Sequence, residues 1–302
     1  MSSSRLSPTL AGTTAFFYAL GYPIGALAVR AATPGVVLLS RFTLSALLLA
    51  LIVRVRHLAW PRGTQLGHAA VVGLLTQGVQ FVGCYEAMHS GVSPVLVALV
   101  IAMNPVVTAV IATRVLAERI TVRSLAAVVL ALLAVCSAFA GRIVRVGHGD
   151  PGVLWVVAAV LGLSAGGVYQ QRFLHEGHPV ANNAVGVTVA LLPAAVFAAL
   201  TPQSVTDPRQ AAWTIGVLVV ANSVIAASLY LAAIRRAGAS AVSLLFGVIP
   251  SIAALLSWLI TGERPDVGVL VGLVLGSLAC YLGRNPVRGP ARHPAAGRTP
   301  AR

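Results

Sequence analysis

The sequence predicts an all-α membrane protein with ten transmembrane helices, arranged as two inverted five-helix repeats. Three observations lead to this fold class. Apolar residues make up 58% of the chain and charged residues only 9%, whereas about 25% of a soluble domain is charged. Apolar runs of about 20 residues, the length of helix that crosses the hydrocarbon core of a bilayer, follow one another along nearly the whole chain. Several residues also recur at an offset of 145 positions.

The apolar runs are interpreted as membrane spans, taken in chain order. They cover residues 9–29, 35–53, 66–87, 94–113, 122–140, 152–171, 180–200, 212–233, 239–260 and 266–283. A soluble protein built from these helices would have almost no polar faces to present to water, so a soluble fold is excluded.

The internal repeat needs no gap. A shift of 145 residues relates Gly21 to Gly166, Pro34 to Pro179, Tyr85 to Tyr230, Ala87 to Ala232, Pro105 to Pro250 and Glu118-Arg119 to Glu263-Arg264. Because a five-helix unit has an odd number of spans, its second copy starts on the opposite side of the membrane, and the repeats are inverted. The predicted segments are a cytoplasmic stub (1–8), the first repeat (9–140), an inter-repeat loop (141–151), the second repeat (152–283) and a basic, disordered cytoplasmic tail (284–302).

The 21 basic residues of the chain are all arginine. With the N-terminus inside, fifteen arginines fall on the inner side, five fall on the outer side and Arg41 lies within a span. This agrees with the positive-inside rule, although Arg142 and Arg145 of the inter-repeat loop oppose it. We expect a multi-pass protein of the cell (inner) membrane with both termini in the cytoplasm. Dispersed arginines suit anionic lipid headgroups, so the lipid bilayer is an expected partner and nucleic acid is not. A homodimer is left open.

Short motifs in both halves carry a family resemblance. They are Pro34 with Arg41-Phe42, Tyr85-Glu86-Ala87-Met88, Asn104-Pro105, Ala117-Glu118-Arg119-Ile120-Thr121, Tyr230-Leu231-Ala232, Pro250 and Thr261-Gly262-Glu263-Arg264-Pro265. Together, over nearly the whole chain, they resemble the EamA-type family of the drug/metabolite transporter superfamily. The resemblance implies ten helices in two inverted repeats and the export or import of small metabolites. One departure is that Arg41 aligns with Gly186, so its charge occurs in one half only.

Polar residues inside membrane spans are costly and mark interior or pathway positions. Gln77 and Gln80 share one face of the third span with Gly73, and Gln77 aligns with Asn222 of the eighth span. We expect these amides to line a substrate cavity near the midplane. The alternative is that they form hydrogen bonds between neighbouring helices.

Aromatic residues with a polar end complete the candidate cavity, because a tyrosine offers an apolar wall and one hydroxyl. The candidates are Tyr18, Tyr22, Tyr85, Tyr169 and Tyr230, together with Gln170. Tyr85 and Tyr230 end their spans, where an interfacial aromatic belt is an equal alternative.

Pro105 and Pro250 lie inside the fourth and ninth spans, and each frees a carbonyl four residues earlier. Both are expected to be helix flex points. Asn104, next to Pro105, is the polar neighbour expected to face the cavity, with a purely structural kink as the alternative.

Two charged residues lie near the predicted pathway. Arg41 is about 10 Å into the second span, where it either meets an anionic group of the substrate or snorkels to the outer headgroups. The sequence slightly favours a structural role for it. Glu86 points away from the face that carries Gln77, so an interfacial carboxylate is favoured over a proton-coupling group.

The leading functional hypothesis is a secondary transporter that exports small organic metabolites, such as amino acids or amphiphilic compounds, by alternating access. The chain has no lysine for a Walker A site, no HExxH motif and no metal-binding spacing among its cysteines. No catalytic residue, metal site or cofactor is therefore predicted, and the chain is not expected to be an enzyme. A polytopic membrane enzyme and a non-transporting scaffold are the alternatives. A site with at most one arginine suits polyphosphates poorly.

Overall fold

The computed structural model describes residues 6–90, 92, 94–116, 122–143, 152–262 and 267–283. Most of the predicted stub and inter-repeat loop, the pairs Glu118-Arg119 and Glu263-Arg264, and the basic tail lie outside these residues. Apart from one isolated antiparallel bridge between Ala32 and Val205, the regular elements of the described residues are helices. The all-α class is therefore confirmed.

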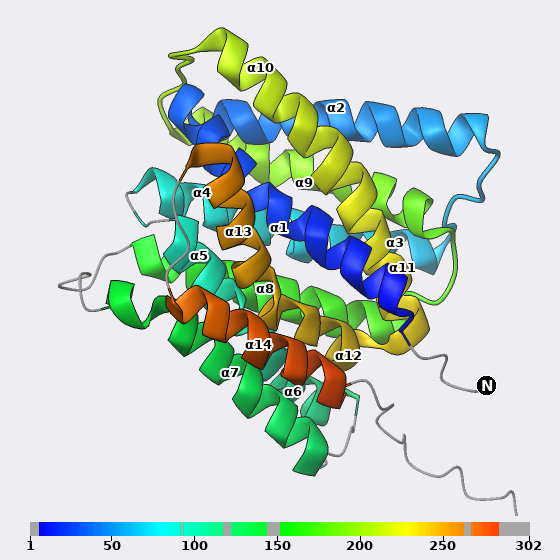
Figure 1. Ribbon diagram of the computed structural model, residues 1–302. Coiled ribbons are helices and arrows are strands. Elements are labelled where there is room, and N and C mark those ends of the chain that lie inside the picture. The colour runs from blue at the N-terminus through cyan, green and yellow to red at the C-terminus, as the bar shows by residue number, and fades with distance from the viewer. Residues whose placement is uncertain are drawn as a thin grey trace, which may run out of the picture.

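The helices follow the predicted spans in chain order (Figure 1). They are α1 (Pro8–Ala31), α2 (Pro34–Val55), α3 (Thr64–Gly73), η1 (Leu74–Val79), α4 (Gln80–His89), α5 (Pro94–Ile101), α6 (Asn104–Val115), α7 (Val122–Ile143), α8 (Gly152–Phe173), α9 (Pro179–Leu200), α10 (Pro208–Val217), η2 (Leu218–Ala226), α11 (Ala227–Ala237), α12 (Ala239–Ser243), η3 (Leu244–Gly247), α13 (Ile249–Thr261) and α14 (Val267–Gly283). Each of four predicted spans corresponds to more than one of these elements.

Within the described residues, six helices are long and apolar enough to cross a membrane. They are Pro8–Ala31, Pro34–Val55, Thr64–His89, Leu154–Phe173, Pro179–Leu200 and Pro208–Ala237. A bent pair, Ala239–Gly247 with Ile249–Ile260, makes a seventh if it is one span, and α7 and α14 contain shorter apolar stretches. A multi-pass membrane protein is therefore supported, and the count of ten spans stays a prediction.

Large apolar side chains face outward in the middle of the helices. Leu47 and Leu51 of α2 and Leu192 of α9 are each more than half exposed. A continuous apolar surface of this kind is unfavourable in water and is typical of a membrane-facing surface. Both sides of these helices are thus apolar, one packed inside the bundle and the other directed to lipid.

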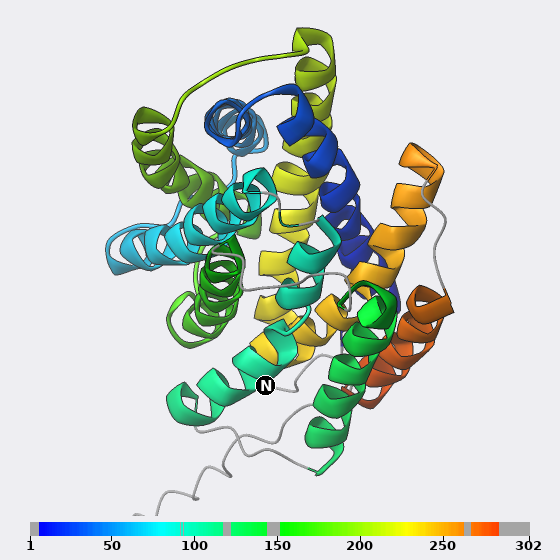
Figure 2. The same ribbon diagram turned by 90° about the vertical axis from the view of Figure 1, so that its left-hand side faces the viewer.

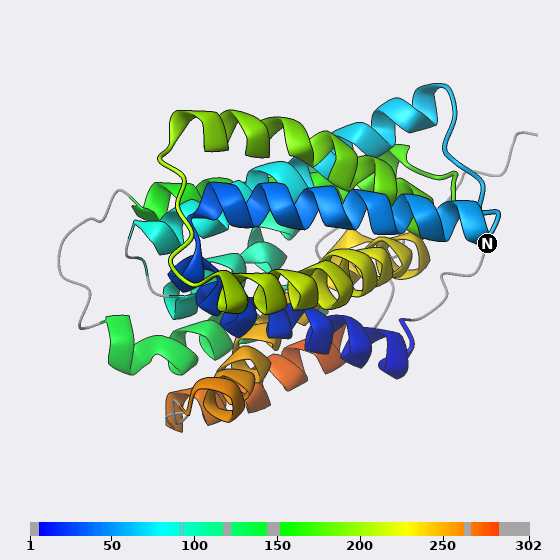
Figure 3. The ribbon, with the colours of Figure 1, turned by 90° about the horizontal axis from the view of Figure 1, so that it is seen from above.

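The equivalent helices α2 and α9 pack side by side (Figure 3) and run antiparallel. Just before α2 begins, the Thr33 amide donates to the Ser204 carbonyl, which follows the end of α9, at 3.0 Å. At the opposite end of the bundle, Gln65 Oε1, which lies beyond the end of α2, accepts from the amide of His175 just before α9 begins, at 3.2 Å. Antiparallel equivalents are what inverted repeats require. The last helices of the repeats, α7 and α14, pack together in another part of the bundle (Figure 2).

The third helix of each repeat contains a π-helical segment at the equivalent place. A shift of 145 residues moves η1 (Leu74–Val79) onto positions inside η2 (Leu218–Ala226). π-helical turns are rare and occur frequently at functional sites. The repeat therefore extends to a local irregularity of the backbone that the sequence pattern did not predict.

The fourth helix of each repeat is interrupted next to its proline. α5 ends at Ile101 and α6 begins at Asn104, beside Pro105. In the second repeat, the short 3-10 segment η3 precedes Pro250, and the two arms of that span differ in direction by 40°. The cause is the missing amide hydrogen of proline, which cannot bond the carbonyl four residues earlier. Movement at these two places stays a prediction.

α3 and α9 cross at two glycines. A Cβ atom added to Gly73 would lie 1.9 Å from the Cα of Gly186, so no larger residue fits without separating the helices. Gly186 is the counterpart of Arg41, which lies in α2 and has room for its side chain. This crossing gives a physical reason why the charge occurs in one repeat only.

Candidate substrate site between the repeats

Arg41 of α2 is fully buried in the interior of the bundle. Each of its three side-chain nitrogens donates one hydrogen bond: Nε to Ser223 Oγ (2.8 Å), Nη1 to the Tyr85 hydroxyl (3.0 Å) and Nη2 to Asn222 Oδ1 (2.5 Å). The alternative that Arg41 snorkels to the outer headgroups is therefore wrong. Its hydroxyl and amide partners come from both repeats.

The guanidinium also lies against an aromatic ring, since its Cζ is 4.0 Å from the ring centroid of Phe81. This is a cation–π contact, which is stronger away from water. Within the described part of the chain, no carboxylate forms an ion pair with Arg41. Buried charges are usually paired because their desolvation costs several kcal/mol. Here neutral dipoles and a π face stabilise the charge instead.

Hydrogen bonds continue from the guanidinium through both repeats. Asn222 Nδ2 donates to the Phe17 carbonyl of α1 at 3.3 Å. Asn183 of α9 donates through Nδ2 to the Ser223 carbonyl at 2.7 Å, and its Oδ1 accepts from Gln77 Nε2 at 3.4 Å. The polar network, as we call these residues with Arg41 and Tyr85, thus joins α1, α2 and the third helix of the first repeat to α9 and η2 of the second.

The equivalent amides Gln77 and Asn222 are connected by this network and do not bond each other directly. The Oε1 atoms of Gln77 and Gln80 are buried and have no hydrogen-bond partner among the described residues. A buried acceptor without a partner is unfavourable, and both oxygens can accept from a donor on a bound molecule. The predicted polar face of the third span therefore carries hydrogen-bond acceptors that have no partner among the described residues.

Two glycines of α1 give the network its space. A Cβ atom at Gly21 would lie 2.5 Å from Asn222 Nδ2, and one at Gly25 would lie 3.3 Å from the Tyr85 hydroxyl. Glycines allow the close approach of a helix to a neighbouring group. The glycine face of α1 therefore covers the polar network.

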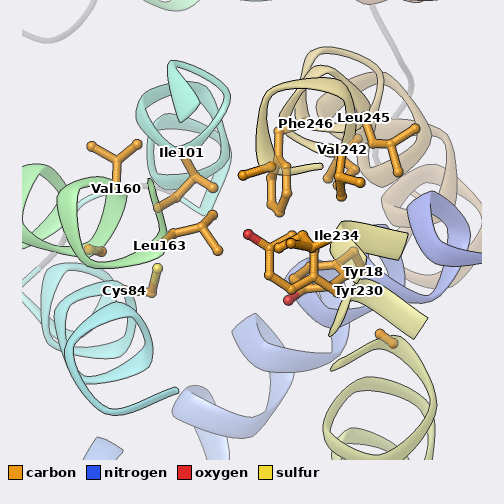
Figure 4. Packing of buried hydrophobic residues seen from close by; sticks show 14 of the residues in the cluster. Tyr18, Cys84, Ile101, Val160, Leu163, Tyr230, Ile234, Val242, Leu245 and Phe246 are labelled. Carbon is orange, nitrogen blue, oxygen red and sulfur yellow. The ribbon is translucent and has the colours of Figure 1, made fainter. Parts of the chain in front are cut away.

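Three aromatic side chains form an edge-to-face cluster from three different helices. The ring centroids of Tyr18 and Tyr230 are 5.6 Å apart, and Phe246 lies 5.3 Å from Tyr18 and 6.1 Å from Tyr230. Figure 4 shows the cluster opposite Ile101 and Leu163. These aromatic and aliphatic groups give the interior an apolar wall.

The aromatic cluster and the polar network are neighbours. Asn222 of the network donates to the carbonyl of Phe17, the residue before Tyr18, and Gly21 of the same helix packs against the Asn222 side chain. The structure therefore brings together Arg41, Tyr85, Gln77 and Asn222 with Tyr18 and Tyr230. Tyr22 packs against the apolar cluster that contains Tyr18 and Tyr230.

Asn104 forms a separate polar contact at the start of α6. Its Oδ1 accepts from Ser164 Oγ at 2.6 Å and from Thr108 Oγ1 at 3.0 Å. Its Nδ2 is buried without a partner among the described residues. Asn104 therefore joins the first repeat to α8 and keeps both N–H groups of its side-chain amide unused.

Tyr169 and Gln170 lie elsewhere. The Tyr169 hydroxyl is 2.9 Å from His68 Nδ1, and its ring packs on Phe173 at 4.7 Å near the end of α8. Gln170 Nε2 donates to the Leu231 carbonyl at 2.9 Å, which fixes α8 to α11. Both side chains connect helices in this structure, and neither joins the network of Arg41.

Sequence reasoning missed several members of the site: Asn183, Ser223, Phe81 and Ser164. Asn183 and Ser223 are polar residues within apolar spans, so the same rule that selected Gln77 could have selected them. Nothing in the sequence distinguishes Phe81 from other apolar residues of its span.

Glu86→Gln is expected to keep transport driven by an ion gradient, with no more than a several-fold loss. Glu86 as a whole is half-buried and makes no hydrogen bond to the polar network: its Oε1 accepts from Ser90 Oγ, one turn later, at 3.5 Å, and its Oε2 is buried without a hydrogen-bond partner among the described residues. Transport by the variant into proteoliposomes, with and without a pH gradient, tests this. A variant that still exchanges substrate but no longer responds to the pH gradient would identify Glu86 as the coupling group.

The described residues contain no group of three or more His, Cys, Asp or Glu side chains that could hold a metal ion. No curated protein matches the sequence. A solved structure described only as "Crystal structure of protein" is similar, with a TM-score of 0.77 and 17% identity over 93% of this chain and 99% of the other. This similarity shows a shared fold. The family model of the EamA-like transporter family matches residues 7–140 and again residues 150–283, so the chain belongs to the EamA-like transporter family.

Proposed function

We propose that this membrane transporter is a secondary transporter of small organic metabolites, such as amino acids or amphiphilic compounds, with export as the expected direction. The observation that carries the proposal is the polar network around Arg41, which is buried where the two repeats meet. Polar and charged groups are retained inside a membrane protein mainly where they bind or conduct a ligand. A small molecule and the lipid bilayer are the proposed partners, and pairing of two copies stays an expectation.

The proposed mechanism is alternating access between two inverted five-helix repeats. The site is bounded by helices of both repeats, so that a rocking motion of one repeat against the other exposes it to each side in turn. The π-helical segments η1 and η2 and the interrupted helices beside Pro105 and Pro250 are the places where the backbone can bend. The aromatic cluster of Tyr18, Tyr230 and Phe246 supplies an apolar wall for the substrate.

Reconstitution into proteoliposomes tests the function. Vesicles loaded with an unlabelled amino acid mixture are expected to accumulate labelled amino acids by counterflow, above the level of protein-free vesicles. An imposed proton gradient then shows whether transport is coupled to protons. If neither amino acids nor a panel of amphiphilic compounds moves faster than in protein-free vesicles, the proposal is wrong.

A reporter fused after Arg302 is expected to show that the C-terminus is cytoplasmic. Ten spans, an even number, place both termini on the same side, and the arginine distribution places that side inside. An alkaline phosphatase fusion, active only outside the cytoplasm, should be inactive, whereas a green fluorescent protein fusion should be bright. Strong phosphatase activity would mean an odd number of spans and would remove the argument for inverted repeats.

A further inference from the structure

We propose that Arg41 binds the substrate directly and selects molecules that carry a single carboxylate group. The inference rests on the proposed transport function and names the substrate class of the same site. Its first support is the hydrogen-bond capacity of the side chain. A guanidinium has five N–H donors, and three are used, one each on Nε, Nη1 and Nη2.

One N–H on each terminal nitrogen of Arg41 therefore has no recorded partner among the described residues. A carboxylate takes two N–H donors from a guanidinium in the bidentate pair that makes arginine the preferred residue for binding it. The number of unused donors is thus the number that one carboxylate requires.

Charge balance is the second support. Arg41 is fully buried, and its contacts in the described chain are neutral groups and the rings of Phe42 and Phe81. A bound carboxylate would neutralise this charge at a depth where the Coulomb attraction is little screened. One cation balances one negative charge, so a monocarboxylate fits and a polyphosphate does not.

The surroundings of the guanidinium suggest what the carboxylate is attached to. The edge-to-face cluster of Tyr18, Tyr230 and Phe246 lies beside the polar network and offers an apolar wall. Apolar area removed from water stabilises a complex. The favoured substrate therefore has an apolar or aromatic body with one carboxylate.

Substrate binding at Arg41 would also act on the contact between the repeats. Asn222 and Ser223, which accept from Arg41, belong to the second repeat, whereas Arg41 belongs to the first. A carboxylate bound to the two unused N–H groups is a stronger acceptor for a guanidinium than an amide or hydroxyl oxygen, so it draws the guanidinium away from these two partners. Occupancy of the site then favours the conformation in which the repeats are separated at this place.

The test compares acids with amides of the same shape. The midpoint temperature of unfolding of the full-length protein in detergent is measured with benzoate and benzamide, indole-3-acetate and indole-3-acetamide, and hexanoate and hexanamide. We expect the acids to stabilise the protein at concentrations at least tenfold below those of their amides. Equal stabilisation by acid and amide, or no stabilisation by any acid, overturns the proposal.

Asn222→Asp provides the decisive variant. It places a carboxylate oxygen 2.5 Å from Nη2 of Arg41 in the native geometry and gives up the bond of the amide to the Phe17 carbonyl. Because the new carboxylate neutralises the guanidinium, the variant should lose the preference for acids. Arg41→Gln should also lose the preference if it folds. Arg54→Gln, which removes an exposed arginine from the same helix, is the control and should keep it. An Asn222→Asp protein that still prefers acids contradicts the assignment.

Counterflow in proteoliposomes separates this inference from the proposed function. If amides move as fast as acids, the chain transports and the carboxylate assignment falls. If acids stabilise the protein selectively but no compound is transported, the assignment of Arg41 as a carboxylate-binding residue is supported and the proposed transport function is wrong.

Discussion

Replacing Gly73 by alanine is expected to destabilise the folded protein by about 3 kcal/mol, the upper part of the range for overpacking. The new Cβ would lie 1.9 Å from the Cα of Gly186 and 2.6 Å from its carbonyl carbon. Backbone atoms cannot move aside as the end of a flexible side chain can, so α3 and α9 must separate. Gly186→Ala should act in the same direction, since its Cβ would lie 2.9 Å from the Cα of Gly73.

The matched control is Gly67→Ala on the same helix, where an added Cβ meets nothing within 4 Å. That variant should be unchanged or stabilised by up to about 1 kcal/mol, because alanine favours a helix over glycine. The stability of the three variants is compared by the fraction of each protein that stays monodisperse in detergent after heating. Equal behaviour of Gly73→Ala and Gly67→Ala would show that the two helices are not in close contact at this crossing.

The sequence predicted the large elements well because their causes are local or periodic. Apolar runs of membrane-spanning length identify the helices, and Pro34 and Pro179, one repeat apart, begin α2 and α9 where a missing amide hydrogen costs nothing. The interruptions beside Pro105 and Pro250 follow from the same missing hydrogen. The π-helical segments could not be predicted, because no residue type specifies them.

The partners of Arg41 could not be predicted either. Tyr85 is 44 residues away in the chain, Asn222 is 181 and Ser223 is 182. Sequence analysis selected Asn222 and Tyr85 as cavity candidates and missed Ser223, and which of these residues meet Arg41 depends on how the helices pack. Tyr169 and Gln170 satisfied the same sequence criterion, and the structure uses both to hold neighbouring helices together.

The difference between Arg41 and Gly186 gives the two repeats different contacts at equivalent places. On one side of the pseudo-symmetric structure, Gly73 and Gly186 bring two backbones into direct contact. On the other side, α2 meets η2 through the hydrogen bonds of Arg41 to Asn222 and Ser223. A close contact between two backbones offers a substrate no side-chain hydrogen-bonding group, whereas the contact through Arg41 does. We therefore expect the two equivalent amides to differ in their importance for folding.

Leucine at Asn222 is expected to abolish transport and to destabilise the protein, whereas leucine at Gln77 should impair transport with little loss of folded protein. Asn222 accepts the 2.5 Å bond from Arg41, and removal of this acceptor leaves a buried, charged N–H donor unsatisfied, which costs about 3 kcal/mol. The bond from Gln77 to Asn183 is long, at 3.4 Å, so its loss costs about 1 kcal/mol.

Folded protein and counterflow activity are measured together for each variant, and activity is expressed per folded molecule. Gln210→Leu is the control, because that amide lies near the start of α10 and donates to the Leu27 carbonyl, outside the polar network; its activity per folded molecule should be unchanged. Gln77→Leu should lose at least tenfold, since Gln77 Oε1 is a buried acceptor with no partner in the described chain and is available to the substrate. If activity falls only in proportion to folded protein in both variants, the amides are packing contacts and the substrate binds elsewhere.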